Sequence, residues 1–390
     1  MSRENPPAAT GPVRRFSRIS GRRLCLYSFW LAVACLVLVW GWPDIERVFR
    51  VGGTLLFGGL AGILLGLWFF LFSGWSRRVK FITATALALF VVVAIALLRV
   101  KEFSGDVVPI LTWRWTPVSD QTLQTAPSEQ IAAQPLKFPH GSRATDAPRF
   151  LGSDGRGEIH GLKLETDWEK HPPREVWKIP MGAGWGGFAV VGNYAITQEQ
   201  RGAQECVNCY DVNNGKLLWS HQDVVRFSEV LGGDGPRATP TIEDGRVYAL
   251  GATGILNCLE GKRASQSGRA NTLKELGQLN LEWGKAPLPL IVRKSGDHQP
   301  RKTSPGGHKT LPSLSDGLAA FHRDTGSSSR KAGRDYACYS SPVLAKFAGM
   351  PQVLSLNATS LSAHDPHTGW ILAGHIPGRE LIPSAPTPCD

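Results

Sequence analysis

Three long apolar runs open the chain and limit what its first hundred residues can form. They span residues 24–42, 53–75 and 81–98, and none contains Asp, Glu, Lys or Arg. A hydrocarbon core about 30 Å thick requires about 20 helical residues at 1.5 Å each. A buried helix of a soluble protein is also apolar on every side, but three successive uncharged runs of this length favour membrane spans. We therefore predict three transmembrane helices within residues 24–99.

The first run is predicted to be a retained anchor rather than a cleaved signal peptide. A signal peptide ends in a small-x-small cleavage pattern, and none follows this run. Trp40, Trp42 and Pro43 close it instead. Tryptophan suits a membrane interface because its ring is apolar while its N–H requires a polar partner.

Basic residues flank these runs asymmetrically. Five arginines lie within residues 14–23, and Arg77, Arg78 and Lys80 separate the second run from the third. Cytoplasmic loops carry the excess of Lys and Arg, so residues 1–23 form a predicted basic cytoplasmic tail. Three spans then place the rest of the chain on the extracytoplasmic side. Arg99 and Lys101 count against this orientation but are outnumbered.

The net charge of +11 does not indicate nucleic-acid binding. Residues 1–100 hold 12 Lys and Arg against 3 Asp and Glu, whereas the remaining residues hold 31 against 29. The basic excess therefore lies beside the membrane runs, and the rest of the chain lacks the charge needed to neutralise phosphates.

Residues 100–147 are predicted to be a Pro-rich extended linker, because prolines recur and no sustained apolar period is present. Trp113 and Trp115 lie within it, and the sequence leaves open whether they rest on the membrane surface or on the following domain.

From residue 148 onward the pattern predicts strands. Runs such as 188–197 and 241–250 alternate apolar and polar residues around Asn-, Asp- and Gly-containing turns. A strand–turn–strand element recurs at 209–219, 319–326 and 362–370, with a degenerate copy at 257–262. The step from Gly215 to Gly261 is 46 residues and that from Gly326 to Gly369 is 43, which is typical of propeller blades, whereas the intervening step of 65 is too long for one blade. The predicted structural positions of the repeat are Asp211, Gly215, Trp219, Asp324, Gly326, Asp365 and Gly369.

Gly215, Lys216 and Trp219 form a turn motif that resembles the PQQ-like (pyrroloquinoline quinone) β-propeller repeat. The stretches 182–188, 197–202, 236–241, 250–254 and 339–342 are similar to a bacterial membrane-anchored branch of that family. The resemblance implies an all-β propeller over residues 148–378, a tryptophan that docks onto an adjacent blade, and a multi-pass protein of the cytoplasmic (inner) membrane. Residues 379–390 are predicted to be a tail.

The repeat is degenerate over about residues 260–335. Pro and Lys replace the expected strand in 285–318, and a central strand does not accommodate proline. Residues 148–378 hold at most about five blades at this period, so the sequence leaves open whether the ring is complete or incomplete. The alternatives are a diverged propeller with an inserted loop, or a frameshift-damaged family member.

Few residues indicate chemistry. A quinoprotein dehydrogenase of the resembling kind carries adjacent cysteines and a Ca²⁺ site, and a haem attachment site requires Cys-x-x-Cys-His. Cys206 and Cys209 are followed by Tyr210, and no cysteines are adjacent. We therefore expect no catalytic residues, no metal and no cofactor, with PQQ and Ca²⁺ implied only under a dehydrogenase alternative. The candidate ligand contacts are Trp185, Gln198, Glu199, Arg201 and Arg237, each of which is also compatible with a packing or turn role.

Two functions of different classes follow. The first is an extracytoplasmic scaffold that binds protein partners and has no enzymatic activity, which the missing catalytic motifs favour. The second is a membrane-bound, PQQ-dependent quinoprotein dehydrogenase. Neither function involves nucleic acid.

The orientation can be tested with a single added cysteine. Ser142→Cys lies beyond the third predicted span, so a membrane-impermeant maleimide should label it in intact cells at a level above that of the parent chain. Labelling that requires permeabilised cells would reverse the predicted orientation.

Overall fold

The computed structural model describes residues 21–106, 108–123, 135–158, 161, 163–292, 318–332, 338–347, 349–358, 360–372 and 376–377. Most of the predicted basic tail, the centre of the degenerate stretch and the predicted tail at 379–390 lie outside the described residues. The chain divides into two compact units, 1–116 and 117–390, which we describe separately.

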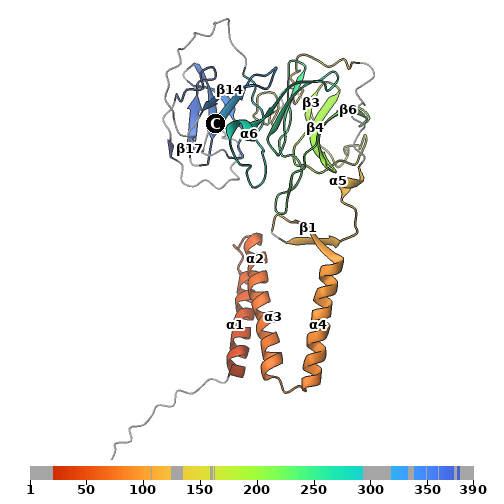
Figure 1. Ribbon diagram of the computed structural model, residues 1–390, viewed down its shortest axis with the longest axis vertical. Coiled ribbons are helices and arrows are strands. Elements are labelled where there is room, and N and C mark those ends of the chain that lie inside the picture. The colour runs from red at the N-terminus through yellow and green to blue at the C-terminus, as the bar shows by residue number, and fades with distance from the viewer. Residues whose placement is uncertain are drawn as a thin grey trace, which may run out of the picture. The chain divides into compact units, whose positions relative to one another are not determined.

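The first unit contains three helices that are long and apolar enough to cross a membrane: Gly21–Gly41, Arg47–Phe72 and Arg77–Leu97. The second begins six residues before the predicted apolar run, and Arg50 in its first turn donates to the carbonyl oxygens of Trp42 and Pro43 in the preceding loop. Figure 1 shows the three helices, and their segments are α1 (Gly21–Gly41), α2 (Arg47–Gly53), the π-helical turn η1 (Thr54–Gly58), α3 (Gly59–Leu67), the π-helical turn η2 (Trp68–Phe72) and α4 (Arg77–Leu97).

The segment predicted as an extended linker, 100–147, contains regular structure and packed residues in the part that the structure describes. An antiparallel hairpin of β1 (Leu98–Phe103) and β2 (Pro109–Trp113) follows α4 directly. Further along, Phe138 is buried in the core of the second unit, and Ala147 forms a β-bridge with Val190. Prolines interrupt regular structure here without preventing the intervening residues from packing.

The second unit is built from antiparallel sheets whose strands follow one another in chain order. Three sheets have four strands, as propeller blades do, and a two-stranded sheet lies between the second and third in the sequence. The strands are β3 (Ala189–Val191), β4 (Tyr194–Arg201), β5 (Gln204–Asp211) and β6 (Leu217–Asp223); β9 (Thr241–Glu243), β10 (Arg246–Leu250), β11 (Ile255–Glu260) and β12 (Gln266–Asn271); β13 (Leu318–Phe321) and β14 (Ser328–Ala332); and β15 (Val343–Phe347), β16 (Met350–Leu356), β17 (Ser360–His364) and β18 (Ile376–Pro377).

Short elements connect or flank these sheets. A small hairpin of β7 (Ser228–Glu229) and β8 (Gly233–Asp234) lies between the first and second sheets in the sequence. The short helices are α5 (Ser119–Thr122) and α6 (Thr272–Leu276). The described part of the chain thus has blade-like sheets, and none of these sheets closes on itself.

The main core lies between the first two four-stranded sheets. One face of β3–β6 contributes Val191, Ile196, Val207 and Cys209, and the facing side chains come from β9–β11. Trp219 from β6 is fully buried in the same cluster. Because side chains alternate along a strand, each sheet presents one face to the preceding repeat and the other face to the following repeat.

A turn with a left-handed residue follows each of β5, β11, β13 and β17. At Gly215, Ala264, Gly326 and Gly369 φ is between +60° and +73°, and each amide donates to the carbonyl oxygen of the residue four positions earlier. Asp211 and Asp365 occupy that earlier position, as predicted, and their carboxylates accept amides of the turn.

Two of the predicted turn assignments shift in register. In the third copy His322, not Asp324, is the counterpart of Asp211, and Asp324 instead pairs with Arg246. In the degenerate copy, Ala264 takes the left-handed position that the sequence spacing assigned to Gly261. Ala264 shows that the degenerate region keeps the turn even without a turn glycine.

Successive repeats are joined by a donor that reaches the next turn. The indole Nε1 of Trp219 donates to the carbonyl oxygen of Gly261 at 2.9 Å, as the family resemblance implied. Trp177 likewise donates to the carbonyl oxygen of Val212 at 2.7 Å. Arg330 lies at the position of Trp219 in its own repeat and donates to the carbonyl oxygen of His367 in the next.

The second repeat lacks such a donor because its docking position is Gly268. An ideal Cβ at this residue would lie 2.8 Å from the amide nitrogen of Gly326, so the next turn packs directly against the glycine backbone. A side chain is therefore excluded where Trp219 stands in the first repeat.

Removing the docking tryptophan should destabilise the second unit. Trp219→Ala leaves a cavity in the core and removes the donor to Gly261, so we expect a loss of about 3–5 kcal/mol in unfolding free energy. Trp370→Ala is the matched control, because this side chain is 77% exposed and should change stability by less than about 0.5 kcal/mol. Equal thermal melts of the two variants would contradict the docking role.

Candidate functional site

The glycine-rich segment 182–187 packs tightly against its neighbours, which leaves it no room to act as the flexible edge of a pocket. An ideal Cβ on Gly182 would lie 2.3 Å from the carbonyl oxygen of Gln200, and one on Gly186 would lie 2.5 Å from that of Ala238. Ala183 exchanges backbone hydrogen bonds with Gln200. These glycines thus allow the segment to pass between β4 and residues 236–239.

The predicted polar cluster at 198–201 is divided by strand alternation. Gln198 faces the second sheet, where its Nε2 donates to the carbonyl oxygens of Ala238 and Leu250. Glu199 and Arg201 point to the opposite face. The three side chains are almost completely buried and therefore do not form one solvent-facing group.

Glu199 is the centre of a buried hydrogen-bond network. Its carboxylate accepts from the Tyr210 hydroxyl, Asn208 Nδ2, Arg201 and the amide of Gly182. Burial alone would raise the pKa of Glu199, but the bonds from Tyr210 and Arg201 outweigh it and lower the pKa. This network joins β4, β5 and the glycine-rich segment, so Glu199 and Arg201 have structural contacts rather than an open ligand position.

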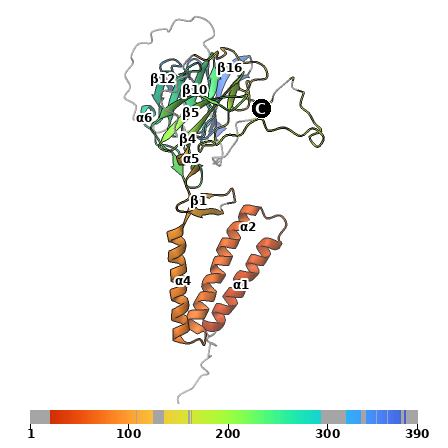
Figure 2. The same cartoon turned by 90° about the vertical axis from the view of Figure 1, so that its right-hand side faces the viewer.

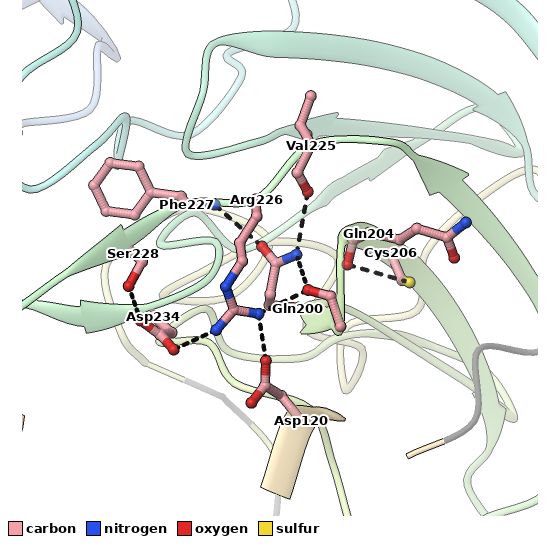
Figure 3. A network of polar contacts seen from close by, with 10 residues as sticks. Asp120, Gln200, Gln204, Cys206, Val225, Arg226, Phe227, Ser228 and Asp234 are labelled. Atoms are coloured by element: carbon pink, nitrogen blue, oxygen red, sulfur yellow. Dashed lines mark hydrogen bonds and ion pairs between the residues drawn. The ribbon is translucent and has the colours of Figure 1, made fainter. Parts of the chain in front are cut away.

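A second network, absent from the sequence-based candidates, surrounds Arg226. Its guanidinium bonds to Asp120 at 2.5 Å and to Asp234 at 2.6 Å. Gln200 accepts from the amide of Phe227, and its Nε2 donates to the carbonyl oxygen of Val225. Figure 3 shows Asp120 and Asp234 converging on Arg226 from α5 and β8. No local sequence pattern could reveal this network, since Asp120 and Arg226 are 106 residues apart.

Arg237 lies in a partly open cluster of aromatic side chains. Its Nε donates to the carbonyl oxygen of Trp283 at 2.9 Å, and its Nη2 donates to that of Gly233 at 2.8 Å. The guanidinium carbon is 5.1 Å from the ring centre of Phe227. The ring of Trp283 stacks on Tyr339 with centres 5.4 Å apart.

Two donors of this cluster are buried without an acceptor. Within the described residues, neither Arg237 Nη1 nor Trp283 Nε1 has a hydrogen-bond partner. Burial lowers the pKa of Arg237, while the nearby carboxylates of Glu229, Asp234 and Glu205 oppose that shift. Unpaired buried donors are costly, and the pair marks this cluster as a place where the fold carries such a cost.

Large apolar side chains lie exposed beside these donors. Trp185 is 68% exposed, and its backbone amide donates to the carbonyl oxygen of Pro236 at 2.8 Å. Its indole borders Gly233 of the β7–β8 hairpin. Val230 and Leu231, 62% and 53% exposed, form the tip of that hairpin. We define the β7–β8 surface as Trp185, Phe227, Glu229, Val230, Leu231, Arg237, Trp283 and Tyr339.

Of the five predicted ligand contacts, the structure thus brings only Trp185 and Arg237 to this surface. Cys206 and Cys209 point to opposite faces, as alternation predicts, and burial raises the pKa of both thiols. In the described part of the chain no group of three or more His, Cys, Asp or Glu side chains is arranged to hold a metal ion.

Glu205, which sequence analysis missed, connects β5 to the loop after β10. Its Oε1 accepts from the amide of Ala252 at 2.8 Å, and its side chain is almost completely buried. Burial raises the pKa of Glu205 to about 7, with the amide of Ala252 acting in the opposite direction.

Comparison with known proteins gives structural neighbours only. No protein-family profile and no curated protein matches the chain. A quinohemoprotein alcohol dehydrogenase from Comamonas testosteroni superposes with a TM-score of 0.35 and 14% identity over 51% of this chain and 36% of its own. BamB from Moraxella catarrhalis superposes with a TM-score of 0.29 and 13% identity over 48% of each chain. A europium-containing methanol dehydrogenase superposes with a TM-score of 0.29 and 12% identity over 50% of this chain and 51% of its own. The matches thus span about half or less of these proteins, and similarity at this level carries no argument about function.

Substitution of Glu205 should change the pH dependence of stability. The carboxyl ionises near pH 4.3 in an unfolded chain and near 7 when folded, so the stability that its protonated form contributes is lost as pH rises through this interval. Relative to Glu205→Gln, the unfolding free energy of the parent chain should fall by up to about 1.4 kcal/mol per pH unit within this interval. Urea unfolding at pH 5 and pH 8 measures the difference, with exposed Glu275→Gln as control. A pH-independent difference would contradict the buried, ionising role of Glu205.

Proposed function

We propose that this protein is an extracytoplasmic interaction scaffold held in the cytoplasmic membrane by its three N-terminal helices. The sheets of residues 189–377 form PQQ-like propeller repeats in this proposal, and protein partners bind to the β7–β8 surface. Three apolar helices and successive four-stranded sheets support this architecture. The Arg-rich flanks of the spans support the orientation.

The composition of the β7–β8 surface is the observation that carries the proposal. Tryptophan, tyrosine and arginine supply much of the binding energy at protein interfaces, where they lie beside apolar neighbours that exclude water. Trp185, Val230 and Leu231 offer exposed apolar area, and the half-buried side chains of Arg237 and Trp283 lie beside it.

The support beneath the surface suits recognition without refolding. Arg237 is held by the carbonyl oxygens of Trp283 and Gly233, and Glu229 Oε2 accepts the amide of Leu231 at 2.8 Å. Asp234 at the base of the hairpin is tied to Arg226. Side chains fixed in this way lose less conformational entropy on binding.

The proposal involves no redox cofactor. The dehydrogenase alternative would require the carboxylates of PQQ to be met by cations and its ring by an aromatic floor, usually with Ca²⁺. Arginine and tryptophan of the β7–β8 surface are compatible with either kind of ligand, so the two functions must be separated by experiment.

A photocrosslinking residue at Leu231 should give a discrete protein adduct in intact cells. The adduct should disappear when Trp185→Ala is added, because this exposed side chain contributes to binding and little to folding. A crosslinker at Leu279, which is 93% exposed outside the surface, is the positional control. Trp370→Ala is the matched substitution control and should leave the adduct unchanged.

Two outcomes would contradict the scaffold. One is an identical adduct pattern from Leu231 and Leu279, or none from Leu231. The other is micromolar binding of PQQ with Ca²⁺, measured by calorimetry, together with substrate-dependent dye reduction, which would favour the dehydrogenase.

A further inference from the structure

The β1–β2 hairpin has one apolar and one polar face. Cross-strand partners share a face, and the pairs Leu98–Trp113 and Val100–Leu111 are apolar throughout. The intervening pair is Arg99 with Thr112. A bulge at Lys101 ends this alternation. The hairpin is therefore amphipathic over the part nearest α4.

The apolar face lies open. Val100, Leu111 and Trp113 are 45%, 55% and 49% exposed. Trp115, 64% exposed, extends this face because its ring stacks on Trp113, with centres 5.2 Å apart and planes 12° apart. A two-stranded hairpin cannot cover its own face and is marginal in water, so this surface requires an apolar neighbour.

The hairpin is fixed to the end of a membrane-type helix. β1 begins at Leu98, the residue after the last residue of α4. Arg114 reaches back to the carbonyl oxygen of Ile95 at 2.9 Å, and Arg99 donates to that of Thr116 at 2.6 Å. Both arginines thus have carbonyl partners close to the helix end.

The other end of the hairpin reaches the beginning of the second helix. Asp106 pairs with Arg47 at 3.0 Å. Val108 and Pro109 line an apolar hollow together with Trp40, Val51 and Leu55. Figures 1 and 2 show the hairpin lying across the helix ends rather than continuing their direction. It therefore connects the two helix ends that share one side of the predicted membrane.

We propose that the apolar face of the β1–β2 hairpin, with Trp113 and Trp115, inserts into the headgroup–acyl boundary of the lipid leaflet in which α4 ends. This inference rests on the membrane crossing in the proposed function. The occupant is lipid because the face continues directly from a span, without a linker that would carry it into water. Tryptophan prefers this depth, and Arg99 and Arg114 extend toward carbonyls while their stems remain apolar.

Two adjacent residues on opposite faces provide the test. Nitroxide labels are placed on Leu111→Cys and Thr112→Cys in the full chain, with Cys25, Cys35, Cys338 and Cys389 replaced by Ser. Each protein is reconstituted in vesicles of phosphatidylethanolamine and phosphatidylglycerol. Relaxation by oxygen, which concentrates in lipid, is compared with relaxation by a water-soluble nickel chelate. A label at Val92→Cys in α4 serves as the reference for a lipid-facing span.

The expected result is that the label at 111 shifts toward the oxygen-dominated value of the label at 92, while the label at 112 stays nickel-accessible. Shielding of 111 from both reagents would mean that protein covers the face and would overturn the inference. Equal nickel accessibility at 111 and 112 would also overturn it. If the label at 92 itself lacks the lipid signature, the membrane crossing fails and the hairpin proposal fails with it, which distinguishes the two failures.

Discussion

The docking of one repeat onto the turn of the next is the contact on which the second unit depends. Trp177, Trp219 and Arg330 each donate to a turn carbonyl of the following repeat. In each case the accepting carbonyl lies within a turn that a left-handed residue closes. A single sheet has two faces to bury and cannot do so alone, so these contacts determine how the apolar faces meet. Where the donor is absent, at Gly268, backbone packs on backbone instead.

The same packing positions the β7–β8 surface. The glycine-rich segment 182–187 fits between β4 and residues 236–239 only because it lacks side chains at the closest approaches. This fit holds the backbone of Trp185 against Pro236 and turns its indole outward. Arg226 then ties Asp234 to α5, which makes residues near the start of the second unit part of the support for the hairpin. The exposed aromatic group is thus a consequence of tight packing beneath it.

Sequence reasoning found the parts of the fold that have a local signature. Three uncharged runs identified the helices, and Gly215 with Trp219 identified the clearest repeat, because spacing and residue type both report on short-range geometry. Ala264 and His322 were missed because their backbone positions are imposed by the surrounding sheet and not by residue preference. In the candidate site, Trp185 and Arg237 were found, whereas Phe227, Trp283 and Tyr339 were not. They converge from segments far apart in the sequence: the amide of Trp283 donates to the hydroxyl of Tyr339, 56 residues away.

The hairpin after α4 also gives partners to the charges that follow the third span. Arg99 and Lys101 counted against an extracytoplasmic second unit, since positive charge normally marks the cytoplasmic side. In the structure the guanidinium of Arg99 is engaged with the carbonyl oxygen of Thr116, and Lys101 pairs with Glu102. The positive-inside rule counts Lys and Arg and gives acidic neighbours little weight, so both residues still count against the orientation that the more numerous basic residues before α1 and α4 favour. If the hairpin enters the lipid boundary as proposed, the chain leaves the membrane only after Trp115, close to residue 117, where the second compact unit begins.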